Sequence, residues 1–225
     1  MTKNIILASE SPRRKELLTR LGLNFIVMPA EIEEDVSPLQ APQDLVKKNA
    51  FQKACHVSKL VDHSLVIGAD TMVVLGNYRL GKPVDEEDAY HTLSLLSGKQ
   101  HEVITGLCVI DTDTGDIQIE AEITKVFFRN LTDNEINAYI ASGDYKGKAG
   151  SYAIQSLGAI FVDRIEGCYY NVVGLPITRL YLMLKKQGVT LWGGANSGVW
   201  SFNKRPARKY APQGEAGNPR GEEFN

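Results

Sequence analysis

The sequence has few cysteines and histidines, and neither residue type shows a metal-binding spacing. Its three cysteines, Cys55, Cys108 and Cys168, form no CxxC pair, and its four histidines show no HExxH arrangement. A zinc site therefore has little support. An odd number of scattered cysteines is typical of a protein that folds without disulfides in a reducing compartment.

The chain also lacks an excess of one charge and a long apolar run. Lys and Arg number 25 against 27 Asp and Glu, a formal net charge of −2, which argues against a general nucleic-acid binder. The apolar stretch near the N-terminus turns polar at Ser9, so it is too short for a signal peptide or a membrane span. We therefore expect a cytoplasmic protein with neither a nucleic acid nor a membrane as partner.

The common nucleotide-binding loops are absent as well, since the sequence contains no GxxxxGK[ST] and no GxGxxG. With 225 residues, 43% of them hydrophobic, the chain is long enough to build a full core without disulfides. We expect one domain over residues 1–190. Gly, Pro and charged residues dominate 191–225 without an apolar period, which predicts a disordered tail. Trp192 and Trp200 leave room for a docking role, and an alternative end of the coding sequence stays open.

Apolar runs and periodicities predict strands and helices in alternation. Strands are expected over residues 5–8, 24–28, 65–69, 72–75, 100–111, 117–129 and 159–162, and helices over 12–21, 42–61, 85–96, 132–142 and 176–187. The helix over 132–142 begins with a capping box, Thr132 to Glu135. Helices interleaved with strands indicate an α/β or α+β layered domain.

Short polar clusters lie where these elements begin or end. They are Ser9–Arg14, Gly68–Thr71, Gly81–Pro83 and Lys146–Gln155. In the first cluster a strand leads into a helix N-terminus, whose free backbone N–H groups attract anions, and Arg13 and Arg14 add positive charge. We interpret it as a phosphate site rather than as a solvated arginine pair.

Asp70 directly follows a strand that is expected to be buried. An isolated carboxylate there costs several kcal/mol unless a cation or a metal pairs with it. A structural aspartate that caps Thr71 or a turn is an equally good interpretation. The acidic pair Glu33-Glu34 is, by itself, most typical of a solvated loop.

Three lysines add to the positive charge of the arginines. Lys53, Lys82 and Lys148 are each typical of surface lysines when taken singly. A nucleoside triphosphate carries roughly four negative charges, which several basic groups and a divalent ion together neutralise. The residues alone therefore predict a phosphorylated small-molecule substrate and metal dependence.

Seven short motifs follow one another between residues 4 and 188: Ala8–Leu18, Gly68–Thr71, Leu80–Pro83, Leu96–Gly98, His101–Gly106, Lys148–Gln155 and Asn171–Pro176. In this order they closely resemble the Maf family of nucleotide pyrophosphatases. The resemblance implies a two-lobed α/β fold, in which a mixed twisted sheet with flanking helices bends around a deep cleft, similar to the inosine triphosphate pyrophosphatase group. It also implies a homodimer as a common state.

The resemblance further implies an activity. Maf-like enzymes hydrolyse a nucleoside triphosphate between its α and β phosphates, which releases pyrophosphate with the help of a divalent metal, Mg²⁺ or Mn²⁺, and removes nucleotides from the pool. Ile154-Gln155 and the run Tyr170–Pro176 resemble the branch that acts on dTTP and UTP more than the branch that acts on 7-methyl-GTP.

Carried over position by position, the resemblance makes Asp70 the general base and, together with Glu34, a metal ligand. It assigns substrate preference to Arg13, Thr71 and Gln155. The other residues expected to bind the substrate are Ser9, Arg14, Lys53, Lys82 and Lys148.

Two positions depart from the family pattern. Gly147 stands where the family usually has an acidic residue, so Lys148 loses a partner unless another carboxylate substitutes. Ser156 stands where the family usually has glycine, which adds a Cβ beside Gln155. Two further hypotheses stay open: a nucleotide-binding regulatory protein with weak or no hydrolysis, and an enzyme of the same class that prefers a purine.

Overall fold

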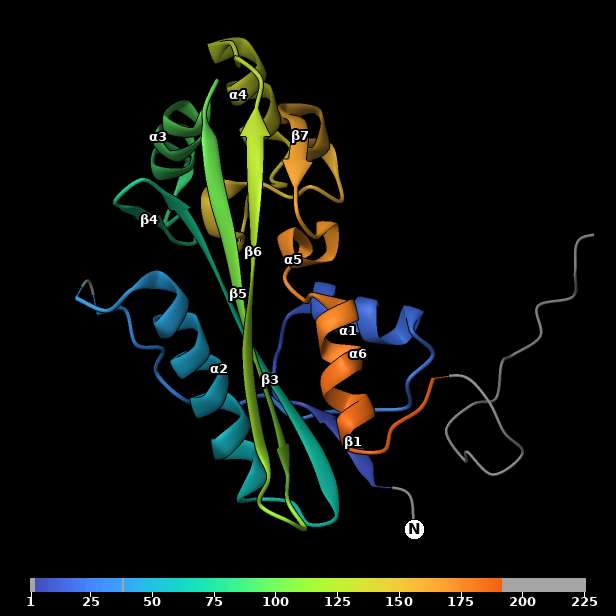
Figure 1. Ribbon diagram of the computed structural model, residues 1–225. Coiled ribbons are helices and arrows are strands. Elements are labelled where there is room, and N and C mark those ends of the chain that lie inside the picture. Colours follow the sequence, from blue (N-terminus) through green and yellow to red (C-terminus); the bar gives the residue numbers. More distant parts are fainter. Residues whose placement is uncertain (1–2, 38, 192–225) are drawn as a thin grey trace, which may run out of the picture.

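Three long strands form the spine of the molecule (Figure 1). They are β3 (Ser64–Leu75), β5 (Gln100–Asp111) and β6 (Ile117–Phe128), each of 12 residues. The computed structural model describes residues 3–37 and 39–191. Within them the sheet has seven strands in the order β2-β1-β3-β5-β6-β7, with β4 paired to β3. The shorter strands are β1 (Asn4–Leu7), β2 (Ile26–Val27), β4 (Tyr78–Leu80) and β7 (Val162–Glu166).

Helices flank both faces of this sheet, as Figure 1 shows. α2 lies on one face, α1 and α6 lie on the other, and α3 and α4 gather at the far end of the long strands. β1 pairs in parallel with β2 and β3, whereas the long strands pair antiparallel, so the sheet is mixed. The expected fold class is confirmed. The helices are α1 (Pro12–Arg20), α2 (Pro42–Ser58), α3 (Glu86–Leu96), α4 (Asp133–Ala141), α5 (Tyr169–Val173) and α6 (Ile177–Lys186), with two short 3-10 helices, η1 (Ala149–Ser151) and η2 (Leu157–Phe161).

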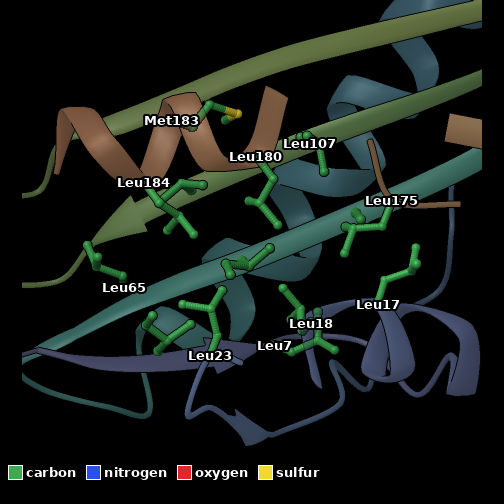
Figure 2. Close-up of a cluster of buried hydrophobic side chains, with 14 of the residues drawn as sticks. Leu7, Leu17, Leu18, Leu23, Leu65, Leu107, Leu175, Leu180, Met183 and Leu184 are labelled. Atoms are coloured by element: carbon green, nitrogen blue, oxygen red, sulfur yellow. The ribbon is translucent and has the colours of Figure 1, made fainter. Parts of the chain in front are cut away.

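Successive side chains of the sheet enter different hydrophobic clusters. Leu65 and Ile67 pack with the leucines of α1 and α6 (Figure 2), whereas Val66 packs with the alanines of α2. This alternation is the period of two that a strand imposes. Another cluster, at the far end of the strands, joins Leu93 of α3 to Ile136 of α4. Separate cores at the two ends of the long strands give the molecule its two lobes.

Several local predictions are confirmed. Ser11 caps α1 by accepting a hydrogen bond from the backbone N–H of Arg14 at 3.5 Å, and Pro12 is the first helical residue. Thr132 and Glu135 form the expected capping box at the start of α4. The bounds of β5, β6 and α6 lie within one residue of their predicted positions.

The strand predictions contain two errors. β3 does not stop at Asp70, because its backbone continues the ladder there and pairs Asp70 with Gly106 of β5. Backbone pairing does not depend on the side chain, so a carboxylate interrupts the apolar pattern without ending the strand. The strand expected over 159–162 is wrong as well: η2 occupies this stretch, and β7 begins at Val162. Sequence patterns predict neither β4 nor α5, because both are short.

The end of the described chain lies against α6. Leu191, the first residue of the expected tail, is buried in the cluster that contains Leu180 and Leu184. The rest of that tail, with Trp192 and Trp200, lies outside the described residues. Within 3–37 and 39–191, no helix has both the length and the apolar character needed to cross a membrane.

A buried histidine lies behind the cleft, in the cluster with α3 and α4. His101 is 1% exposed, and its Nε2 lies 2.9 Å from the hydroxyl of Tyr152. Burial lowers the pKa of His101 to about 3. The unfolded chain therefore binds this proton at a higher pH than the folded chain, and stability falls as the pH drops from the unfolded value towards 3. We expect this group to make the free energy of unfolding about 2 kcal/mol lower at pH 5 than at pH 7.

Urea unfolding at both pH values measures this effect in the wild type and in His101→Gln, which keeps a polar side chain but does not titrate. The variant is expected to lose that part of the pH dependence, whereas His91→Gln, at an exposed position, keeps it. Equal pH dependence in wild type and His101→Gln contradicts the prediction.

Candidate functional site

A cleft with a volume of about 1420 Å³ opens between the two lobes. Its walls come from β3, from the N-terminus of α1, from α2, and from the segments 29–36 and 152–156. The structure brings every predicted site residue to this cleft: Ser9, Arg13, Arg14, Glu34, Lys53, Asp70, Thr71, Lys82, Lys148 and Gln155.

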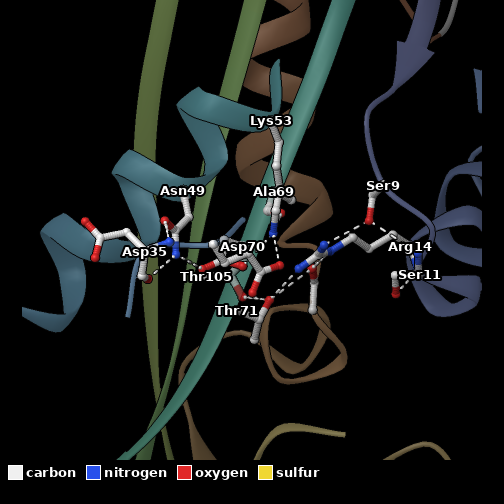
Figure 3. Close-up of polar contacts among 12 residues, drawn as sticks. Ser9, Ser11, Arg14, Asp35, Asn49, Lys53, Ala69, Asp70, Thr71 and Thr105 are labelled. Carbon is white, nitrogen blue, oxygen red and sulfur yellow. Dashed lines mark hydrogen bonds and ion pairs between the residues drawn. The ribbon is translucent and has the colours of Figure 1, made fainter. Parts of the chain in front are cut away.

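Asp70 lies in the middle of β3, and only 7% of it is exposed. Its Oδ1 lies 2.8 Å from Nζ of Lys53, and its Oδ2 accepts a hydrogen bond from the side-chain amide of Asn49 at 3.1 Å (Figure 3). Both partners project from the buried face of α2, one turn apart. The buried carboxylate is therefore paired and hydrogen-bonded, which offsets the cost of removing it from water.

Lys53 also binds a second carboxylate. Its Nζ lies 2.6 Å from Oε1 of Glu34. Burial acts to raise the pKa of Glu34, but the hydrogen bond from Lys53 and the charges of Lys53, Lys82 and Arg14 outweigh it and hold this pKa below its ordinary value. Glu34 and Asp70 thus approach one cation from two different segments of the chain.

Arg14 is buried, and its guanidinium is engaged by the protein. It donates to the carbonyl oxygen of Gly174 at 2.9 Å and to the hydroxyls of Ser9 and Thr71, both at 3.0 Å. Burial lowers the pKa of Arg14, and the negative charge of Asp70 opposes this shift. The side chain therefore ties the start of α1 to β3 and to the end of α5, and it places a positive charge at the cleft.

Arg13, the neighbouring arginine, has a different environment. It is half-buried, and burial lowers its pKa while the charge of Asp144 raises it. Nζ of Lys148 lies 3.5 Å from Oδ1 of the same Asp144. The partner that Lys148 lacks at Gly147 is thus supplied by a carboxylate four residues before it.

Sequence reasoning missed the residues that hold these groups in place. Asn49 donates to Asp70 and exchanges two further hydrogen bonds, each of 3.0 Å, with the backbone of Asp35. The hydroxyl of Thr105 lies 3.0 Å from that of Thr71. A signal for Asn49 exists in the sequence: it and Lys53 are polar residues four apart on an otherwise apolar helix face.

The segment that carries Glu34 has another anchor. Arg79 of β4 donates hydrogen bonds to the backbone carbonyls of Ser37 and Gln40. Nothing in the sequence pattern near Arg79 indicates this contact, because β4 and the segment it holds are about forty residues apart. The hydrogen bonds fix this side of the cleft to the sheet.

Two of the carboxylates in the cleft, those of Glu34 and Asp70, would hold a metal ion only together with the phosphates of a nucleotide. Among residues 3–37 and 39–191, no three His, Cys, Asp or Glu side chains gather as a metal cluster. Glu34 and Asp70 both contact Nζ of Lys53, so the cation that they share in this structure is the lysine ammonium group. Proteins usually hold Mg²⁺ by one or two carboxylates together with substrate phosphates, rather than by a full protein cage.

Known proteins resemble this chain over most of its length. The family model for Maf-like protein matches residues 4–187. The dTTP/UTP pyrophosphatases of Syntrophomonas wolfei and Ruminiclostridium cellulolyticum are 48% and 52% identical to it over 185 residues, which cover 82% of this chain and 98% and 96% of those proteins. A crystal structure of a nucleoside-triphosphatase (dITP/XTP pyrophosphatase) from Mycobacterium abscessus has 16% identity and a TM-score of 0.38 over 57% of this chain and 75% of that chain. This chain belongs to the Maf family.

Proposed function

We propose that the protein is a metal-dependent nucleotide pyrophosphatase that hydrolyses dTTP and UTP to the monophosphate and pyrophosphate. Relatives that carry the name dTTP/UTP pyrophosphatase are 48% and 52% identical to it over most of its length. The observation that carries the proposal is the buried, paired carboxylate of Asp70 in a cleft lined by arginines and lysines. Such a cleft suits a polyanion that must be attacked by water.

Asp70 is the proposed general base. Lys53 and Asn49 each engage one of its oxygens, and every carboxylate oxygen retains a further lone pair. Asp70 orients a water molecule and accepts its proton while the water oxygen forms a bond to the α-phosphorus. The bond between the α and β phosphates breaks, and pyrophosphate leaves with the electron pair.

Basic residues of the cleft offset the charge of the substrate. Arg13, Lys82 and Lys148 line the walls and are proposed to contact the triphosphate and the leaving pyrophosphate. A divalent ion, Mg²⁺ or Mn²⁺, would supply Lewis-acid stabilisation of the charge on the phosphate oxygens. Glu34 and Asp70 are the residues that would hold this ion.

Recognition of the base is assigned to Gln155. Its side-chain amide has both donors and an acceptor, which matches the N3–H and the neighbouring carbonyl of uracil or thymine. Arg13 and Thr71 are the other proposed specificity residues, but the hydroxyl of Thr71 already binds Arg14 and Thr105. We therefore infer that Gln155 contributes more to the choice of base, and that Thr71 acts largely by fixing Arg14.

A substrate panel tests the proposal. Pyrophosphate release is measured for the common nucleoside triphosphates and for 7-methyl-GTP, each with Mg²⁺, with Mn²⁺ and with EDTA. We expect release from dTTP and UTP that EDTA abolishes. A preference for 7-methyl-GTP or for a purine triphosphate contradicts the assigned branch. Tight nucleotide binding without release of pyrophosphate contradicts the proposed enzymatic activity.

The regulatory alternative was motivated by the missing acid at Gly147. Because Asp144 lies 3.5 Å from Lys148, this departure does not leave the lysine without a carboxylate, and it no longer favours the regulatory alternative. A homodimer and a cytoplasmic location stay parts of the proposal. Light scattering on purified protein tests the first, and fractionation of cells tests the second.

A further inference from the structure

Asp144 joins three segments at one wall of the cleft. It follows α4, and its Oδ2 accepts hydrogen bonds from the hydroxyl of Ser156 at 2.6 Å and from the hydroxyl of Tyr139 at 3.0 Å. Its Oδ1 lies 3.5 Å from Nζ of Lys148. The side chains of Asp144 and Lys148 are only 19% and 16% exposed, so water screens this pair less than it screens a surface pair.

The residues that Asp144 holds, directly or through Tyr139, lie before and after Gln155 in the chain. Ser156 follows Gln155 directly, and Ala153, two residues before Gln155, donates its backbone N–H to the Tyr139 hydroxyl at 3.3 Å. The carboxylate therefore holds the turn directly at Ser156 and, through the Tyr139 hydroxyl, at Ala153, on the two sides of the residue that is proposed to read the base. Ala153, Gln155 and Ser156 all line the cleft.

Asp144 also acts on the charged groups around it. Burial acts to raise its pKa, but the hydrogen bonds from Ser156 and Tyr139 and the charge of Lys148 outweigh this and hold the pKa below its ordinary value. The carboxylate is thus negative at neutral pH. Its charge supports the protonated state of Arg13 against the effect of burial.

We propose that Asp144 is a positioning residue that holds Lys148 and Gln155 in a fixed relation, and so links recognition of the triphosphate to recognition of the base. Ser156 connects Asp144 to Gln155, because the hydroxyl of Ser156 donates a hydrogen bond to the Asp144 carboxylate and Ser156 directly follows Gln155. The proposal rests on the proposed function, since it concerns the same cleft. It gives the serine at position 156 a role that glycine cannot fill.

The test measures the effect of Asp144 on Lys148 and its effect on Gln155 separately, by equilibrium binding, which does not require turnover. The probes are the non-hydrolysable α,β-imido analogues of UTP and CTP, and inorganic pyrophosphate. Uracil presents a donor at N3 where cytosine presents an acceptor, so the ratio of the two analogue Kd values reports on Gln155. Pyrophosphate carries no base and reports on Lys148.

Two variants are compared with the wild type by calorimetry. Asp144→Asn is expected to raise the Kd of the uridine analogue about tenfold. It is also expected to lower the ratio of the cytidine Kd to the uridine Kd about threefold or more, and to weaken pyrophosphate binding about threefold or more. Ser156→Ala is expected to lower discrimination by about threefold and to leave pyrophosphate binding unchanged. Asp163→Asn, on exposed β7, is the matched control and keeps all three values.

The proposal is overturned if the variants lose affinity for both analogues equally, or if both variants keep the wild-type ratio of the two Kd values. It is also overturned if the wild type binds the two analogues equally. Ser156 is exposed, so its variant remains informative if Asp144→Asn does not fold. Failure of the wild type to release pyrophosphate from dTTP or UTP refutes the proposed function alone, because the binding ratios are measured without hydrolysis.

Discussion

Asp70→Asn is expected to lower kcat for dTTP and UTP on the order of a hundredfold or more, with the protein still folded. The amide has nearly the same shape as the carboxylate, and its oxygen still accepts a hydrogen bond from Lys53 or Asn49, the two partners of Asp70. It does not, however, accept a proton from water at neutral pH. Pyrophosphate release at saturating nucleotide measures the effect, and thermal unfolding confirms that the variant is folded.

Asp111 offers a matched control for this experiment. It is also a carboxylate of the same sheet that is 2% exposed and bound to a lysine, Lys3, but it does not line the cleft. We expect Asp111→Asn to lower the stability and to keep kcat. A kcat of Asp70→Asn close to that of the wild type would show that Asp70 is not the base.

Gly106→Ala is expected to destabilise the fold by about 3 kcal/mol, because the added methyl group has no space. Its Cβ would lie 2.2 Å from the carbonyl oxygen and 2.4 Å from the carbonyl carbon of Val46, both in the backbone of α2. A helix backbone cannot move aside as a flexible side chain does, so α2 has to shift as a whole. Urea unfolding measures the change in the free energy of unfolding.

The same substitution is expected to lower activity in the protein that remains folded. α2 carries Asn49 and Lys53, and a shift of this helix moves both away from Asp70. Gly81→Ala is the control for stability, since a Cβ there meets nothing within 4 Å. Equal stability of Gly106→Ala and the wild type would mean that α2 packs less tightly on the sheet than the structure shows.

The helix starts and the long strands of this protein were predictable because local chemistry defines them. Ser11 and Thr132 cap helices through hydrogen bonds to residues three positions away, so the signal lies within a few letters of sequence. The strand over 100–111 contains an apolar run, the strand over 117–128 begins with apolar and polar residues in alternation, and a polar turn joins the two. The sequence of η2 predicts a strand instead, because a short apolar run has the same composition in a strand and in a helical turn.

The site was predictable as a set of residues but not as a geometry. Every site residue that the sequence predicted lines the cleft, but the ordered motifs did not include Asn49 and did not distinguish the roles of Arg13 and Arg14. Arg14 makes its hydrogen bonds to Gly174, Ser9 and Thr71, so it is largely committed to the protein. A pair of adjacent arginines looks uniform in sequence, and only the direction of each side chain on α1 separates them.

The sequence by itself determined which family this chain belongs to, where its longer helices begin, and several of the polar residues that line the cleft, because these depend on residue type and on spacing over a few positions. The tertiary structure decided the pairings: Lys53 with Asp70 and Glu34, Asn49 with Asp35, and Asp144 with Lys148, where Gly147 alone suggested a missing partner. Electrostatic and hydrogen-bond partners are set by distance in space. The distances between remote segments depend on how α2 packs against the sheet, and the local pair of Asp144 and Lys148 depends on the turn that follows α4.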